Sequence, residues 1–205
     1  MFDYAAAMER LVEDILTRSD VFQHIEMPAL LIGCIRARNC QSTGLYARTV
    51  PLRFENGSHT TRRGSATYRV PKVIHEGNEI LYIVSFCLPR FQDLSFEDEI
   101  TTIFHELYHI APHFNGDIRR FEGKNYVHGS GKKYDRQMQE LSRKYLHEHP
   151  QQEIFAFLRP SYEELSCAHG GVRMTIYQTP HPELVEPVTL PATAKKKRKR
   201  TGKRR

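Results

Sequence analysis

Cysteine is scarce in this 205-residue chain, and its cysteines form no C-x-x-C pair of the kind that builds a zinc ribbon. The four are scattered along the sequence as Cys34, Cys40, Cys87 and Cys167. This spacing indicates no disulfide framework either, so we expect reduced thiols in a cytoplasmic protein.

Long apolar runs are also missing, since no stretch approaches the roughly 20 apolar residues that a transmembrane helix needs. The beginning of the chain carries acidic residues where a secretory leader would be positively charged, namely Asp3, Glu9, Glu13 and Asp14. We therefore expect neither a membrane span nor a leader. The length suits one domain with tails.

A basic surplus is absent from the body of the chain, although the formal net charge is +6. Nine of the 30 Lys and Arg residues lie within residues 195–205, which we call the tail. Without the tail, 21 basic residues stand against 24 acidic ones, a net charge of −3. The body is therefore not expected to bind nucleic acid through its charge.

The tail itself is strongly basic, and its densest run is Lys195, Lys196, Lys197, Arg198, Lys199 and Arg200. Such a run can neutralise phosphates and bind nucleic acid without sequence preference. It also resembles a nuclear import signal, and a tail that acts as an address would make the protein nucleoid-associated or nuclear. A solubilising charged terminus is the alternative.

The rest of the chain is organised around His105, Glu106 and His109, which read H-E-x-x-H. On a helix the two histidines lie one turn apart on the same face. Two such imidazoles can bind one Zn²⁺, and Glu106 is placed to act on the water that the metal carries. The motif therefore predicts a catalytic zinc site. An ordinary buried helix with two surface histidines is the alternative.

The sequence on both sides of the motif favours a helix. Ser95 and Asp98 form a capping pair, and the acids of residues 97–99 suit the first turn. An apolar stripe would anchor the helix in a core, and it consists of Ile100, Ile103, Phe104, Leu107 and Ile110. Pro112 is expected to end the helix one turn after the second histidine.

Apolar periodicity predicts helices over residues 2–18 and about 134–145. Strands are expected at 29–38, 49–54, 68–74 and 80–86, with a loop at 58–66. This order is typical of small zincin-type metallopeptidases. We therefore expect an α+β, zincin-like fold, in which a small mixed or antiparallel sheet is backed by helices that include the H-E-x-x-H helix.

Two further expectations concern the ends of this fold. The strand at 80–86 is the candidate for a sheet edge that binds an extended peptide by strand addition. From residue 179, repeated proline and a lack of periodicity predict a disordered linker that leads to the tail. The chain is thus divided into a metallopeptidase domain at 1–178 and a linker with the polybasic tail at 179–205.

A catalytic zinc usually has three protein ligands, so a third donor must come from outside the helix. The candidates are His113, His128, Asp117, Glu122, Asp135, His147 and His169. His128 is favoured because the glycines beside it let the backbone turn sharply and approach closely. His113 is less favoured, since a helix stopped at Pro112 need not aim it at the metal.

Other side chains could support the metal and the substrate. Tyr126, Tyr134 and Arg119 are available as a second donor to the substrate oxygen, and the sequence does not choose among them. Asp117 or Asp135 could orient a ligand imidazole through its other N–H. A turn role is the alternative for Asp117.

The order of these motifs resembles known families. H-E-x-x-H, followed by His128-Gly129 and a helix with aromatic residues, resembles the SprT-like metallopeptidases. Residues 105–110, 114–121, 128–129 and 134–135 resemble more closely the phage metallopeptidase family, over roughly residues 29–146. The resemblance implies an enzyme of the gluzincin or SprT-like type, with zinc on His105, His109 and His128 and Glu106 as the catalyst.

The leading hypothesis is a zinc-dependent metallopeptidase that cleaves a protein or peptide substrate near nucleic acid, with Glu106 as general base. The alternative is a non-catalytic zinc-holding protein with a regulatory or DNA-associated binding role. A third possibility is a phage-type or host regulatory factor whose fold persists without turnover. A structural zinc site has no use for Glu106, so its presence argues for catalysis.

Overall fold

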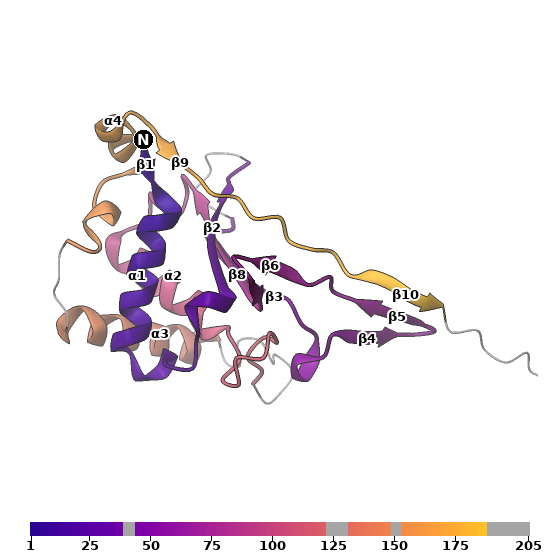
Figure 1. The fold of residues 1–205 in the computed structure, drawn as a ribbon. Coiled ribbons are helices and arrows are strands. Elements are labelled where there is room, and N and C mark those ends of the chain that lie inside the picture. Colours follow the sequence, from indigo (N-terminus) through magenta and orange to yellow (C-terminus); the bar gives the residue numbers. More distant parts are fainter. Residues whose placement is uncertain (39–43, 122–130, 149–152, 188–205) are drawn as a thin grey trace, which may run out of the picture.

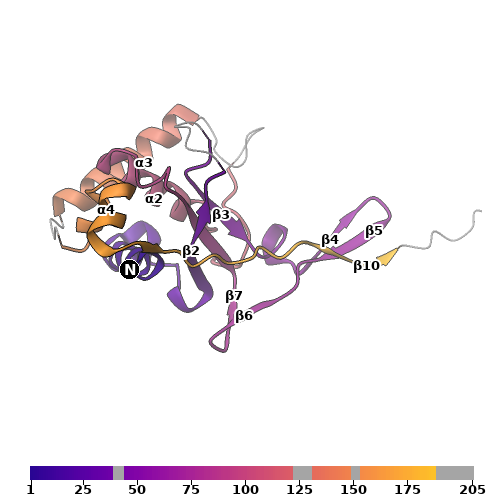
Figure 2. The same ribbon diagram turned by 90° about the horizontal axis from the view of Figure 1, so that it is seen from above.

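The protein is seen here as a computed structural model, which describes residues 1–38, 44–121, 131–148 and 153–187. Its central sheet has three strands in the order β2-β8-β3, namely β2 (Leu30–Arg36), β8 (Tyr82–Leu88) and β3 (Ala47–Pro51) (Figures 1 and 2). β2 runs parallel to β8 with Leu30 opposite Tyr82, and β3 runs antiparallel with Ala47 opposite Phe86.

The position of β8 corrects one prediction. The strand expected at 80–86 exists, but it lies in the middle of the sheet, so its expected role as an edge for peptide binding is wrong. All seven residues of β8 are buried, because both faces of this strand are covered. Such a run of apolar residues is typical of a central strand.

Three helices lie on one side of the sheet, namely α1 (Tyr4–Arg18), α2 (Phe96–Tyr108) and α3 (Gly131–Glu148) (Figure 1). α1 packs on β2 and α2 on β3, and α3 packs on α2. Asp3 caps α1 by accepting a hydrogen bond from the Ala6 N–H at 3.3 Å. The helices expected over 2–18 and 134–145 are therefore confirmed. The residues that α3 turns to the core include Tyr134, Met138 and Tyr145.

The opposite face of the sheet is covered by a smaller apolar cluster of Leu31, Leu52, Ile80 and Ile83. A strap formed by residues 172–179 runs along the outer edge of β2, where the Cys34 N–H donates to the Thr175 carbonyl at 2.7 Å. Gly33 permits this approach, since a Cβ there would lie 2.8 Å from the Tyr177 ring. The strap therefore occupies the edge of β2.

Shorter elements complete the described fold. They are β1 (Phe2–Asp3), β9 (Val172–Arg173), the hairpin of β6 (Val73–His75) and β7 (Asn78–Ile80), helix α4 (Tyr162–His169), and the 3-10 turns Asp20–Phe22, Met27–Ala29, Glu55–Gly57 and Ala156–Leu158. β1 pairs in parallel with β9, which places the N-terminus beside α4 (Figure 1). The expected α+β class, with small sheets and helices, is confirmed.

A second three-stranded sheet projects from the body, and we call it the arm (Figures 1 and 2). It consists of β4 (Thr60–Arg63), β5 (Ala66–Arg69) and β10 (Glu183–Pro187), in the order β10-β5-β4. The sequence predicts a loop at 58–66 and a linker from 179, whereas β4 and β10 lie in these stretches. Both strands depend on pairing with β5, which local periodicity does not reveal.

The start of α2 contains a buried acid, Glu99, whose side chain is fully buried. Neither of its carboxyl oxygens has a hydrogen-bond partner within the described residues. Burial raises its pKa from 4.5 to about 10, and the nearby Asp93 adds to the effect. The carboxyl group is therefore protonated in the folded protein at neutral pH.

Glu99→Gln should stabilise the protein, because the folded state no longer has to keep a proton on this group. The raised pKa means that the parent loses stability as pH rises from about 4.5 towards 10, by up to about 1.4 kcal/mol per pH unit. The expected gain reaches about 3 kcal/mol at pH 7 and is smaller at pH 5. Urea unfolding at several pH values measures it, and a gain independent of pH would contradict the explanation. Glu97→Gln, at an exposed position in the same turn, is the control.

Candidate metal centre

α2 is fixed at its beginning by the predicted cap. The Ser95 hydroxyl accepts a hydrogen bond from the Asp98 N–H at 3.2 Å and donates to the Asp98 carboxylate at 2.7 Å. The helix ends at Tyr108, earlier than Pro112 predicts, and His109 is the capping residue. Just after this end, Ile110 forms an isolated antiparallel β-bridge with Ile118, so the chain no longer continues as a helix.

The carbonyl groups at the end of α2 accept hydrogen bonds from three other parts of the chain. The His105 carbonyl accepts a hydrogen bond from the Tyr134 hydroxyl at 3.3 Å, and the Glu106 carbonyl accepts one from the Thr49 hydroxyl at 2.8 Å. The Tyr108 carbonyl accepts from the Arg119 guanidinium at 2.6 Å, and the His109 carbonyl accepts from the Arg119 N–H at 2.6 Å. The last carbonyls of a helix have no partner inside it. Here β3, α3 and the loop after α2 supply the donors.

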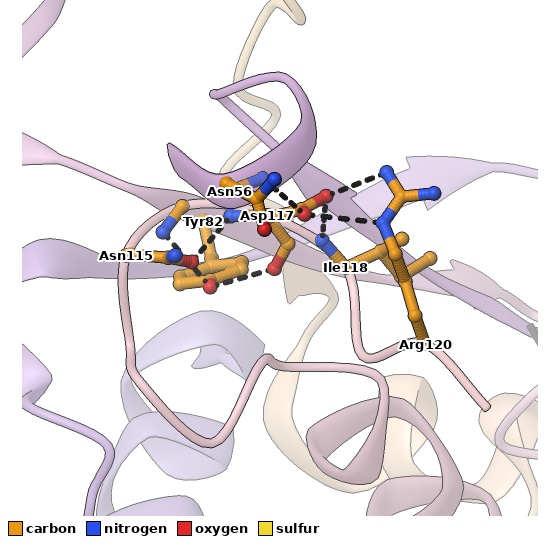
Figure 3. A network of polar contacts seen from close by, with 7 residues as sticks. Asn56, Tyr82, Asn115, Asp117, Ile118 and Arg120 are labelled. Carbon is orange, nitrogen blue, oxygen red and sulfur yellow. Dashed lines mark hydrogen bonds and ion pairs between the residues drawn. The ribbon is translucent and has the colours of Figure 1, made fainter. Parts of the chain in front are cut away.

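The loop that carries Arg119 is held by Asp117, which is buried (Figure 3). The Asp117 carboxylate accepts hydrogen bonds from the Asn56 N–H at 2.9 Å, from the Ile118 N–H at 2.7 Å and from the Arg120 guanidinium. The Tyr82 hydroxyl of β8 donates to the Asp117 carbonyl at 2.8 Å. Asp117 therefore has the turn role that was the alternative to orienting a ligand imidazole.

Gly116 allows this loop to pass close to the body. Its φ of +85° favours glycine, and an added Cβ would lie 2.4 Å from Arg53 Cγ. The Gly116 N–H donates to the Tyr82 hydroxyl at 2.9 Å, so the loop is tied to the central strand on both sides of the turn. The position of Arg119 against α2 thus depends on the sheet.

At this end of α2, His105, Glu106 and His109 bring two imidazole nitrogens and a carboxylate oxygen within 4.8 Å of one another. Among the described residues, these three side chains form the cluster of His, Cys, Asp or Glu residues that could hold a metal ion. The ring centroids of the two histidines are 4.7 Å apart. Imidazole and carboxylate donors suit several divalent transition metals, so the residues present fit a metal.

Tyr134 of α3 packs against both imidazoles. Its ring centroid lies 4.9 Å from that of His105, edge to face, and 6.0 Å from that of His109, nearly parallel. The Arg119 guanidinium lies over the Tyr108 ring at 4.0 Å. These contacts limit the rotation of the rings that could bind the metal.

Glu106 is buried, with 7% of its surface exposed, and this burial raises its pKa to about 7. The Thr49 hydroxyl also lies 2.9 Å from Glu106 Oε2, so its one proton is shared between this oxygen and the Glu106 carbonyl; the contact lowers the pKa of Glu106 against the larger effect of burial. A carboxyl group with such a pKa can take up and release a proton near neutral pH.

A pocket of about 290 Å³ opens beside this cluster. Its lining comes from α2 and from the chain that enters β3, namely Gly44, Leu45, Tyr46, Ala47, Thr101, Thr102, His105 and Glu106. One of the two imidazoles and the carboxylate therefore face a cavity large enough for a small group or part of a peptide.

The structure brings together His105, Glu106 and His109, but it does not test every predicted site residue. His128, the favoured third ligand, lies outside the described residues, as do Glu122, Tyr126 and the tail with Lys195–Arg200. Four other candidates are exposed, namely His113, Asp135, His147 and His169. The roles of His105, Glu106, His109 and His128 stay predictions.

Sequence reasoning missed Thr49, which belongs to a predicted strand 57 residues before Glu106. A threonine in a strand carries no sequence signal for such a contact, because it depends on how β3 packs on α2. Arg119 was considered as a substrate donor, whereas its guanidinium Nε donates to the end of α2.

Fold and site together define a mixed α+β protein with a candidate metal centre at the end of one helix. The profile of the family described as "Putative phage metallopeptidase" matches residues 2–145, more than two thirds of the chain. The chain therefore belongs to this metallopeptidase family. Neither the curated proteins nor the solved structures contain a match. In the part of the chain that the structure describes, no helix is long and apolar enough to cross a membrane.

Arg119→Met should weaken metal binding, because it removes the guanidinium donor to the Tyr108 carbonyl and keeps an apolar side chain of similar length. Loss of a contact behind the ligands typically costs about 10- to 100-fold in metal affinity. Competition with a chromophoric chelator measures the affinity. Arg136→Met, at an exposed position of α3, is the control. An affinity equal to that of the parent would show that this contact does not position the ligands.

Proposed function

We propose that this protein is a zinc-dependent peptidase with a zincin-like arrangement, in which His105, His109 and His128 hold zinc and Glu106 is the general base. One observation carries the proposal: a buried carboxylate lies beside two converging imidazoles at the fixed end of α2. Membership of a metallopeptidase family supports the same chemistry. A structural metal site would gain nothing from this carboxylate.

Zinc bound here would lower the pKa of water towards about 7 and polarise the scissile carbonyl group. Glu106 would accept the proton of the attacking water and then pass it to the leaving amine. Its pKa of about 7, raised by burial, supports both halves of this transfer. The Thr49 hydroxyl, 2.9 Å away, would keep the carboxylate oriented.

The substrate would lie along β3, the edge strand next to α2. The outer edge of β2 is occupied by the strap, and β8 is central. Tyr46 and Leu52 make their main-chain hydrogen bonds to the β8 side, so the alternation of an antiparallel ladder directs the N–H and C=O groups of Ala47 and Thr49 outward. An extended peptide could pair with these groups beside the pocket.

The tail supplies a second part of the proposal. Its cations, Lys195, Lys196, Lys197, Arg198, Lys199 and Arg200, would bind the phosphates of nucleic acid and bring the peptidase to proteins located there. Nine basic residues without an acid support this assignment. The protein would then act inside the cell, in the cytoplasm or on the nucleoid.

Removal of Glu106 and of His128 should have separable effects. Glu106→Gln is expected to retain one zinc per chain and to lose peptidase activity by about 100-fold or more, since the general base is gone. His128→Ala is expected to lose zinc. Elemental analysis and casein cleavage, each with and without a chelator, measure the two effects.

His147→Ala, an exposed histidine of α3, is the control for histidine loss. Stoichiometric zinc in His128→Ala would refute the ligand set. Undiminished cleavage by Glu106→Gln would remove Glu106 from its role.

Thr49→Val should lower kcat by about 10-fold and leave KM unchanged, because a hydrogen bond to a charged group is lost and the shape is kept. Thr49→Ser retains the hydroxyl and should recover most of the activity. Steady-state kinetics on one peptide substrate decides. Equal losses in both variants would mean that Thr49 acts through packing rather than through its hydroxyl.

A further inference from the structure

The pocket beside the candidate metal centre follows from the way β3 packs on α2. The Thr49 hydroxyl meets the Glu106 carboxylate at 2.9 Å, and Ala47, two residues earlier on β3, has its side chain on the same face of the strand. Thr102 precedes Glu106 by one turn of α2, so it lies on the same face of the helix. Ala47 and Thr102 are both small, and both line the pocket. Their size leaves the space between strand and helix open at this level.

The pocket has room for one large side chain. Its volume is about 290 Å³, whereas a cavity of about 150 Å³ already holds a benzene ring. Leu45, Tyr46 and Ala47 supply apolar surface on the side of β3. On α2, the Thr101 hydroxyl lies 3.1 Å from that of Ser142, so it already has a hydrogen-bond partner inside the protein. The pocket therefore suits an apolar group.

The pocket offers no partner to a charged side chain. Among the described residues that line it, the acid is Glu106 and the basic side chain is His105, and both already have roles in the proposed site. Arg90 lies outside the lining, where its guanidinium donates to the Leu45 carbonyl at 2.9 Å. Glu106 would repel an acidic side chain, and a charged group of either sign would lose its water without compensation. The pocket therefore excludes charge.

We propose that this pocket selects the substrate by taking an uncharged side chain of the size of leucine or phenylalanine, with Ala47 and Thr102 as the residues that set its size. The inference rests on the function proposed above, because it concerns the substrate of the same site. A substrate residue that pairs with Ala47 on the open edge of β3 has its side chain on the same face as Ala47, which is the face turned to α2.

This selection defines a class of substrate. Folded proteins keep most of their leucine and phenylalanine side chains in the core, where a peptidase does not reach them. Pairing with β3 also requires an extended backbone. The substrate is therefore a protein segment that is unfolded or extended and exposes a large apolar side chain beside the bond that is cleaved.

The test measures peptide binding separately from cleavage, in the full chain with Glu106→Gln and one equivalent of zinc. Labelled peptides of serine and glycine carry leucine, phenylalanine, glycine, glutamate or lysine at one central position, and fluorescence anisotropy gives their affinities. The leucine and phenylalanine peptides should bind at least about 10-fold more tightly than the other three, because only they bury apolar surface in the pocket.

Two substitutions in the same chain should fill the pocket. Ala47→Leu and Thr102→Leu are each expected to weaken binding of the phenylalanine peptide by about 10-fold and to leave the glycine peptide unchanged, because the added atoms occupy the space. Thermal unfolding checks the fold, and Thr102→Leu, at a partly buried position, decides if Ala47→Leu does not fold. Ala168→Leu, at an exposed position of α4, is the control and should change neither affinity.

Equal affinities for the five peptides would overturn the proposal, and so would the absence of binding. A preference for phenylalanine that survives Thr102→Leu and any folded Ala47→Leu would also overturn it, as would an equal loss in Ala168→Leu. The peptidase proposal fails in a different way: the chain with Glu106 intact would then bind the peptides with the same preference and cleave none of them.

Discussion

The capped end of α2 is the interaction on which the site depends. A helix that stops inside a protein leaves carbonyl groups that need donors. At this end the donors come from Thr49, Tyr134 and Arg119, which belong to β3, α3 and the loop after α2. His105, Glu106 and His109 occupy the same turn, so the groups that satisfy the backbone also fix the candidate ligands. The geometry of the site is thus a property of the whole fold.

Two buried carboxyl groups on α2 show that the surroundings of a glutamate decide whether its burial only lowers stability or can also serve catalysis. Burial raises the pKa of both Glu99 and Glu106. Glu99 has no hydrogen-bond partner among the described residues, and its pKa rises to about 10. Glu106 lies beside Thr49 and a pocket, and its pKa of about 7 suits proton transfer. The same residue type therefore weakens the fold at one end of the helix and can serve catalysis at the other.

The sequence predicted those parts of the structure that interactions between neighbouring residues determine. Helices α1, α2 and α3 and strand β2 follow from apolar periodicity and caps, and the H-E-x-x-H spacing on α2 follows from the 3.6-residue turn, whereas α4 was not predicted. The central position of β8, the strands β4 and β10, and the contact of Thr49 with Glu106 depend on partners far away in the chain. Asp117 was ambiguous because a turn residue and an imidazole partner look alike in sequence. His128 and the tail lie outside the described residues and stay predictions.

The most direct test of the account is X-ray absorption at the zinc edge of the full chain loaded with one equivalent of zinc. The account predicts nitrogen and oxygen ligands at about 2.0 to 2.1 Å, with the outer scattering of several imidazoles and no sulfur ligand. The described cysteines Cys34, Cys87 and Cys167 all lie outside the cluster, and the first two are buried. A sulfur shell near about 2.3 Å, or a spectrum without imidazole scattering, would contradict a metal centre at the end of α2.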